Sequence, residues 1–163
     1  IGQWLGINAP ERVTRLVLCN TGAKIGTPEV WNTRIQTVEA GGEQAMRDLR
    51  DASIGRWFTP DFASAEPEKV DRIVAMLAST PPQGYAANCA AVRDADFREV
   101  LDAVRAPTLI VAGTHDAVTT SADGRFLQER IPGAEYVEFP AAHLSNVQMG
   151  AAFTQRVLAF LSA

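Results

Sequence analysis

The stretch from Pro107 to Asp116, P-T-L-I-V-A-G-T-H-D, constrains the fold of this 163-residue chain more than any other segment. Thr108–Ala112 is a largely apolar run rich in β-branched residues, which is typical of a strand buried on both faces of a parallel sheet. Pro107 marks the start of this strand, because proline cannot donate a hydrogen bond to a central ladder. Gly113 permits a sharp turn, so Asp116 is expected just past the carboxyl end of the strand, where open α/β sheets bind ligands.

The remainder of the chain predicts two further strands and a long helical insertion, which together indicate an α/β protein. Val13–Cys19 and Tyr136–Phe139 are short runs with strand character, so we expect a mostly parallel sheet of about three strands. Residues 27–105 carry helical periodicity and almost no strand signal. We therefore expect residues 1–26 and 106–163 to form the core, and residues 27–105 to form a helical cap over the carboxyl edge of the sheet.

Glycine and proline residues set the expected boundaries of the helices. Pro28 suits the first turn of a helix, which we expect to end at Gly41–Gly42. A second helix is expected over residues 43–57, and Glu66–Pro67–Glu68 is typical of the start of another. The final helix is predicted over Val147–Leu161, where apolar residues recur at helical spacing.

Composition and charge argue against several classes of partner. A formal net charge of -4, with no run of lysine or arginine, argues against a nucleic-acid surface. No apolar stretch approaches the roughly 18 residues of a membrane-spanning helix, so we expect no membrane partner. Cys19 and Cys89 match no zinc or redox spacing, and two thiols far apart in sequence fit a reduced compartment, the cytoplasm.

The beginning of the chain indicates a piece of a longer polypeptide. Ile1 is not methionine, and I-G-Q-W-L-G-I reads as the body of a helix that has already begun. A helix over Ile1–Ile7 followed by the strand Val13–Cys19 is half of a βαβ unit whose first strand the chain does not include. We therefore expect a missing amino-terminal half of the same polypeptide to be the main partner of this chain.

Asp116 and His143 are the candidate catalytic residues. Asp116 follows the central strand, and His143, in F-P-A-A-H-L-S, follows the third strand. Because the carboxyl ends of parallel strands lie at one edge of a sheet, both side chains are expected to project from that edge. An acid followed along the chain by a histidine is the order found in α/β-hydrolase triads, where a buried carboxylate orients the imidazole base. The alternative is a turn aspartate and an unrelated surface histidine, and His115 is interpreted as structural.

Four stretches resemble the carboxyl-terminal part of the 3-oxoadipate enol-lactonases, a family of α/β hydrolases in bacterial aromatic catabolism. They are P-T-L-I-V-A-G-T-H-D, F-P-A-A-H-L-S-N, R-W-F-T-P and G-Y-A-A-N-C-A-A-V-R-D. The resemblance runs over essentially the whole chain, and it implies a partial α/β-hydrolase fold. It also implies that Asp116 and His143 match the acid and base of the family's triad.

The family's nucleophile is absent from the chain. Ile1–Trp4 resembles the helix that follows the family's G-x-S-x-G elbow, so the serine is expected a few residues before Ile1, and the oxyanion-hole loop is expected to be missing as well. Ser53 has only the second glycine and lies in a helical segment, and Ser145 is too close to His143 to sit on a separate elbow. Cys19 ends a strand without an elbow and is better interpreted as a buried structural thiol.

Arg56, Trp57 and Asn20 are the candidate substrate-binding residues. The family's substrate carries a carboxylate beside its lactone ring, which an arginine could clamp while tryptophan covers the ring. The alternative is a surface arginine and a tryptophan that packs the cap. Asn20 follows a strand at the expected active edge, although turn chemistry alone would also explain it.

The resemblance implies that the full-length protein hydrolyses 3-oxoadipate enol-lactone in the β-ketoadipate pathway, with a small-molecule lactone as its partner and no cofactor. The chain by itself is then an inactive fragment, because the nucleophile lies elsewhere. Two alternatives stay open at this point. One is a different α/β hydrolase, either an esterase or a cofactor-free haloperoxidase-like enzyme, and the other is a non-catalytic fragment.

Overall fold

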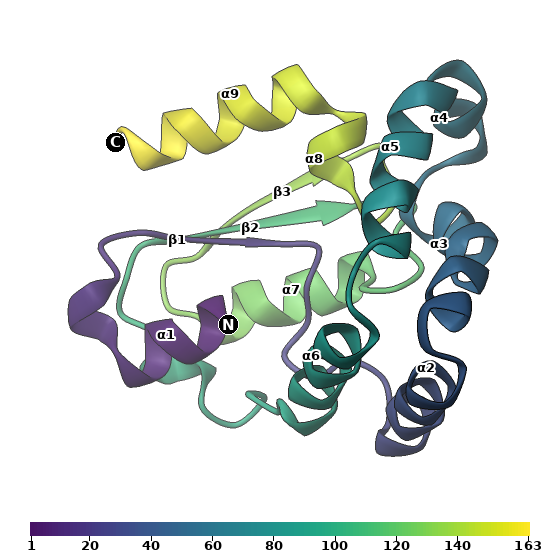
Figure 1. Ribbon diagram of the computed structural model, residues 1–163. Coiled ribbons are helices and arrows are strands. Elements are labelled where there is room, and N and C mark those ends of the chain that lie inside the picture. Colours follow the sequence, from purple (N-terminus) through teal and green to yellow (C-terminus); the bar gives the residue numbers. More distant parts are fainter. The chain divides into compact units, whose positions relative to one another are not determined.

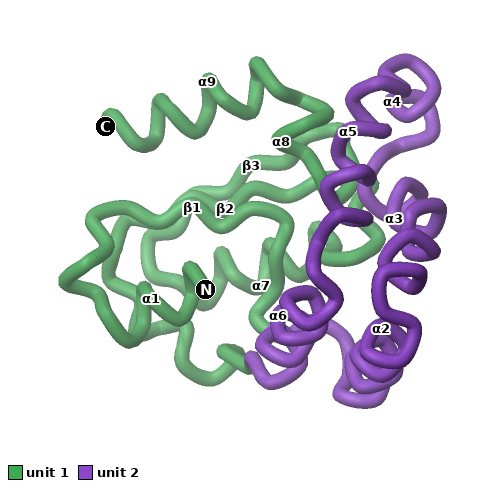
Figure 2. Tube along the Cα trace, in the orientation of Figure 1, with its two compact units in different colours: residues 1–23, 96–163 green, residues 24–95 purple.

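A computed structural model describes residues 1–163, which form two compact units (Figure 2). The first unit comprises residues 1–23 and 96–163, and the second comprises residues 24–95. Residues 96–105, which we had expected to belong to the cap, lie in the first unit because Leu101 and Val104, 0% and 1% exposed, pack into its core.

A three-stranded parallel sheet forms the centre of the first unit, in the order β1-β2-β3 (Figure 1). The strands are β1 (Leu16–Cys19), β2 (Thr108–Gly113) and β3 (Glu135–Phe139). All six residues of β2 are buried, as the apolar run predicts for a central strand. The predicted mostly parallel sheet of about three strands is confirmed.

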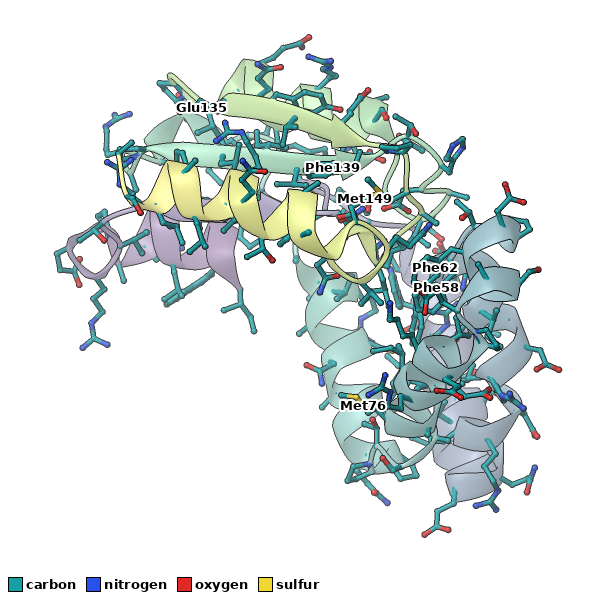
Figure 3. The ribbon with its side chains drawn as sticks, turned by 90° about the horizontal axis from the view of Figure 1, so that it is seen from above. Phe58, Phe62, Met76, Glu135, Phe139 and Met149 are labelled. Carbon is teal, nitrogen blue, oxygen red and sulfur yellow. The ribbon has the colours of Figure 1, made fainter.

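Alternating side chains of β2 build one core on each face of the sheet. Ile110 packs with Leu127 of α7 (Ser121–Arg130), on the face that α1 (Gly2–Asn8) also covers. On the other face, Leu109 packs with Phe160 of α9 (Gly150–Leu161), and Figure 3 shows Met149 beside Phe139 in the same cluster. Helices therefore cover both faces, which is the arrangement that buries a parallel sheet.

The second unit consists of helices only, and we refer to it as the helical unit. Val38 and Met46, both 0% exposed, form its small core with Leu77, and Trp57 and Tyr85 pack against this core. Phe58 and Phe62 stack with ring centroids 5.5 Å apart (Figure 3). No helix of the chain combines the length and the apolar character that a membrane span requires. The helices are α2 (Pro28–Asp48), α3 (Arg50–Trp57), α4 (Pro60–Ala65), α5 (Pro67–Ala78) and α6 (Pro82–Asp94).

Two predicted helix boundaries can be compared with the structure. At Gly41–Gly42, where one helix was expected to end and a second to begin, Gly42 leaves helical geometry with a φ of 57° and a ψ of -137°, so α2 consists of two helical stretches joined by a kink and ends at Asp48. The predicted final helix is interrupted at Met149, which separates α8 (Ser145–Gln148) from α9. No proline, the strongest sequence signal for a helix break, marks the interruption at Met149.

Gly113, the last residue of β2, permits the close approach of two loops at the carboxyl edge of the sheet. A Cβ atom built at this position would lie well under 3.0 Å from the carbonyl oxygens of Ala141 and Ala142, a separation that real Cβ atoms essentially never show. These oxygens belong to the backbone that leads into His143, and His115 N donates a hydrogen bond to Ala141 O at 3.0 Å. The loop after β3 therefore rests directly on the end of β2.

Gly113→Ala is expected to destabilise the first unit by about 3 kcal/mol or more, because the clash is with backbone and not with a flexible side chain. Urea unfolding followed by circular dichroism would measure the loss. The matched control is Gly150→Ala, at the start of α9, where no atom lies within 4 Å of the new Cβ. An equal effect of the two substitutions would contradict the close-approach argument.

Candidate active site

Asp116 and His143 meet at the carboxyl edge of the sheet. His143 Nδ1 donates a hydrogen bond to Asp116 Oδ2 at 2.9 Å. The turn after β2 places the acid, since Asp116 N donates to Gly113 O at 3.1 Å. The loop after β3 places the histidine on the same edge. The structure thus brings together the two residues that the strand pattern pointed to.

The Asp116 carboxylate is fully buried and receives hydrogen bonds on both oxygens. Oδ1 accepts from the backbone N–H groups of Val118 at 2.8 Å and Thr119 at 3.0 Å. Besides His143, Oδ2 accepts from the Thr119 hydroxyl at 2.9 Å and from Asn20 Nδ2 at 3.0 Å. With a side-chain exposure of 0%, the carboxylate has exchanged its water shell for fixed protein donors.

These donors keep Asp116 ionised in spite of its burial. Burial by itself raises the pKa of a carboxyl group. Hydrogen bonds from His143, Asn20 and the backbone of Thr119, together with the proximity of the imidazole, outweigh burial and lower the pKa of Asp116 from 3.8 to about 2. At neutral pH the group is therefore a carboxylate.

His143 is held in one tautomer and one orientation. Its Nδ1 faces the carboxylate, so the proton of the neutral ring lies on Nδ1 and Nε2 is left as the acceptor. The His143 side chain is 23% exposed, so the ring borders solvent while its carboxylate partner is buried. A histidine arranged in this way can remove a proton from a hydroxyl and stabilise the resulting cation through the aspartate.

Asn20 connects the acid to the loop that carries the histidine. It adopts a φ of 45°, a conformation that asparagine tolerates better than most residues. Its Nδ2 also reaches Ala142 O at 3.3 Å, and its Oδ1 accepts the hydroxyl hydrogen of Ser145 at 2.5 Å. Contact of Asn20 with a substrate stays a prediction.

Sequence reasoning missed the supporting roles of Thr119 and Ser145. Both side chains are almost completely buried and hydrogen-bonded within this network. The spacing D-x-x-T after a strand could have suggested Thr119, since aspartate commonly accepts backbone N–H groups two and three residues further on. No local pattern connects Ser145 to Asn20, because 125 positions separate them.

The remaining candidates lie elsewhere or are inert. His115 is exposed, and its interpretation as structural stays a prediction. Burial raises the pKa of Cys19 to about 11, so at neutral pH it is a thiol and not the reactive thiolate.

Arg56 and Trp57 lie on α3 in the helical unit, where Arg56 Nη2 is 3.4 Å from Ser53 Oγ and Trp57 packs against the small core. No cluster of three or more potential metal ligands is present.

The comparisons with known proteins agree on one family. The chain matches the family described as "alpha/beta hydrolase fold" over residues 1–148. It is 40% identical over 160 residues to a 3-oxoadipate enol-lactonase of Acinetobacter baylyi, a match that covers 98% of this chain and 59% of the relative. The chain therefore spans about three fifths of the length of this curated relative.

Solved structures give the same result. The enol-lactonase from Burkholderia xenovorans LB400 superposes with a TM-score of 0.94 at 40% identity, covering 99% of this chain and 61% of that one. A hydrolase from Pseudomonas aeruginosa PA01 superposes with a TM-score of 0.92 at 42% identity, covering 99% and 60%. The resemblance predicted from the sequence is confirmed.

The lowered pKa of Asp116 predicts how the free energy of unfolding depends on pH. Its folded-state pKa of about 2 lies below the usual 3.8, so the carboxylate stabilises the fold above pH 3.8, and this contribution is lost as the pH falls through about 2. The contribution is roughly 2 kcal/mol. Urea unfolding of the parent chain and of Asp116→Asn at a series of pH values would isolate it, and parallel pH profiles would contradict the assignment.

Asn20→Ala is expected to cost about 1–3 kcal/mol, because it leaves the buried Ser145 hydroxyl without its acceptor and takes one donor from Asp116. It should also raise the pKa of Asp116, which carboxyl ¹³C NMR would measure. Asn146→Ala, at an exposed position of the same unit, is the control. An unchanged Asp116 titration in Asn20→Ala would remove Asn20 from the network.

Proposed function

Because the chain belongs to the α/β-hydrolase family, we propose that it supplies the acid and the base of a serine hydrolase whose substrate is 3-oxoadipate enol-lactone. The observation that carries this proposal is the 2.9 Å contact between the buried Asp116 carboxylate and His143 Nδ1. The choice of substrate rests on the 40% identity to the lactonase of Acinetobacter baylyi.

The nucleophile in this proposal is a serine hydroxyl from a part of the polypeptide outside these 163 residues. The hydroxyl groups nearest the pair serve other purposes, since Thr119 donates to Asp116 and Ser145 donates to Asn20. Both act on the carboxylate side of the network and not on the Nε2 side of His143. The matched relatives are longer than this chain, in keeping with a serine that lies outside the matched residues.

The proposed reaction proceeds in two steps, acylation of the serine and hydrolysis of the acyl-enzyme. The serine oxygen attacks the lactone carbonyl while His143 Nε2 takes the hydroxyl proton, and Asp116 stabilises the imidazolium that forms. The ring C–O bond then breaks, and the departing enol oxygen receives the proton from His143. In the second step the same nitrogen takes a proton from water, the resulting hydroxide attacks the acyl carbon, and His143 returns the proton to the departing serine oxygen.

The helical unit supplies the substrate contacts in this proposal. The guanidinium of Arg56 would bind the carboxylate beside the lactone ring, and Trp57 would cover the ring. Burial, followed by the charge of Arg34, lowers the pKa of Arg56 below its usual value, although the group stays a cation at neutral pH. The proposed site of action is the cytoplasm, in keeping with the two free thiols, Cys19 and Cys89.

The test joins this chain behind the part of the Acinetobacter baylyi lactonase that it does not match, and follows the loss of enol-lactone absorbance. His143→Ala should lower kcat by at least about 10⁴-fold, and Asp116→Asn by about 10⁴-fold. The matched control is His115→Ala, the exposed neighbouring histidine, which should change kcat less than about twofold.

A fluorophosphonate probe separates the joined protein from the chain alone. The probe reacts with activated serines, so it should label the joined protein and leave the 163-residue chain unmodified. Labelling of the chain alone would contradict the placement of the nucleophile. A panel of neutral esters distinguishes the lactonase from a general esterase, and faster turnover of those esters than of the lactone would replace the proposed substrate.

A further inference from the structure

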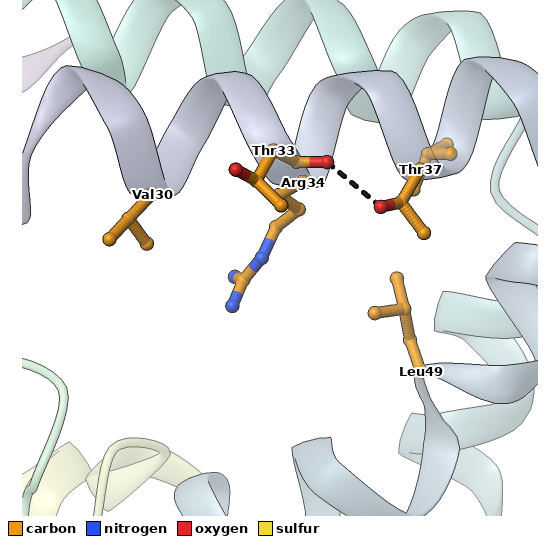
Figure 4. Close-up of a pocket in the computed structure, with 6 residues that line it drawn as sticks. Val30, Thr33, Arg34, Thr37 and Leu49 are labelled. Atoms are coloured by element: carbon orange, nitrogen blue, oxygen red, sulfur yellow. Dashed lines mark hydrogen bonds between the residues drawn. The ribbon is translucent and has the colours of Figure 1, made fainter.

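The helical unit contains an open pocket of about 260 Å³ (Figure 4). This volume is close to the lower end of the range for small-molecule sites, about 300–1,000 Å³. Arg34 is the charged side chain among the residues that line the pocket, and its guanidinium extends away from α2 into the open space. The other lining residues are apolar or carry hydroxyl groups: Val30, Thr33, Thr37, Val38 and Leu49.

The charge of Arg34 is not neutralised by the protein. Three other arginines of the helical unit form ion pairs: Arg47 with Glu43 at 3.6 Å, Arg50 with Asp71 at 2.6 Å, and Arg93 with Asp94 at 2.7 Å. The half-buried Arg34 and Arg56 take part in no ion pair in the structure. A partly desolvated guanidinium without a counter-ion is costly, and an anion from outside the chain would remove that cost.

The neighbours of Arg34 orient its guanidinium without cancelling its charge. The guanidinium carbon lies 5.3 Å from the centre of the Trp31 ring, within the distance of a cation–π contact. Burial is the main cause that raises the pKa of Tyr85, while the charge of Arg34 and its hydrogen bond to the phenol oppose that rise. Tyr85 therefore stays protonated at neutral pH. Both neighbours are uncharged and hold the side chain in place.

The charge of Arg34 also acts on Arg56, another arginine of the helical unit. After burial, the charge of Arg34 is the next cause that lowers the pKa of Arg56, so the two cations lie within electrostatic reach of each other. Two guanidinium groups that act on each other in this way repel, and a bound anion would relieve that repulsion. Other arginines of the same unit are neutralised by a carboxylate of the chain, as Arg50 is by Asp71.

We propose that this pocket binds an organic carboxylate, with the Arg34 guanidinium as the anchoring group. The apolar side chains of Val30, Val38 and Leu49 favour a short carbon chain over an inorganic anion. The assignment of this carboxylate to the substrate rests on the proposed function. It adds Arg34, which sequence reasoning did not single out, as a specificity-determining residue of that reaction.

The test titrates the 163-residue chain with adipate, a stable six-carbon dicarboxylate, and follows the arginine Nε–H resonances by ¹⁵N NMR. The Arg34 resonance should shift saturably. Arg34→Ala should weaken adipate binding at least about tenfold, because a charge-assisted, bidentate interaction is lost. Arg34→Lys should bind with intermediate affinity, since it keeps the charge but loses the planar fork.

Three controls make the result specific. Arg72→Ala removes the same charge from an exposed position of α5 that forms no ion pair, and it should change the affinity less than about twofold. Dimethyl adipate, which lacks the charge, should leave the Arg34 resonance unmoved. Inorganic phosphate should bind more weakly than adipate, and equal binding of the two would overturn the choice of an organic carboxylate. An Arg34 resonance that does not respond to adipate would overturn the pocket itself, without need of any variant.

The same variants separate this inference from the proposed function. In the joined protein, Arg34→Ala should raise KM for the lactone at least about tenfold with a smaller change in kcat. Lactone hydrolysis with an unchanged KM in Arg34→Ala would overturn the inference and leave the function standing. If adipate binding depends on Arg34 but the joined protein does not hydrolyse the lactone, the inference stands and the proposed function is overturned.

Discussion

The arrangement at the sheet edge depends on keeping one buried carboxylate charged. Asp116 is removed from water, and such a group would ordinarily take up a proton. It stays ionised because donors reach it from three separate places: Asn20 after β1, the backbone and hydroxyl of Thr119 after β2, and His143 after β3. Each donor sits at the carboxyl end of a parallel strand, so the sheet topology brings the segments together. The tautomer of His143 then follows from the charge of its partner.

The sequence predicted the pair because strand ends are readable from local patterns. The apolar runs before Asp116 and His143 indicate buried parallel strands, and parallel strands share a carboxyl edge. The hydrogen bond between Ser145 and Asn20 could not be predicted in the same way, because it depends on how two loops fold against each other. The domain boundaries were misplaced for a related reason: Leu101 belongs to the core through packing, which periodicity does not show.

The helical unit illustrates a different limit of sequence reasoning. Its helices were predictable as a group, and the two glycines at Gly41–Gly42 indicated the interruption of α2, but the break at Leu49 was not predictable because no glycine or proline marks it. Arg56 stood out in the sequence because it belongs to a motif shared with a known family, whereas Arg34 did not. Only the structure shows that Arg34 lines a pocket and has no carboxylate partner. A charge without a counter-ion is a property of the fold, and the arginine itself looks ordinary in a helix.

The convergence on Asp116 also has a kinetic meaning. Its donors come from positions as far as 96 residues away along the chain, so the carboxylate cannot become strongly acidic until all three strand ends have docked. In acidic solution between the two pKa values of this group, docking must expel a proton into the solvent. An indicator dye in a stopped-flow instrument would register that expulsion as a burst of acidity. The time at which the protons are released would show when the loops after β1, β2 and β3 pack against each other during refolding.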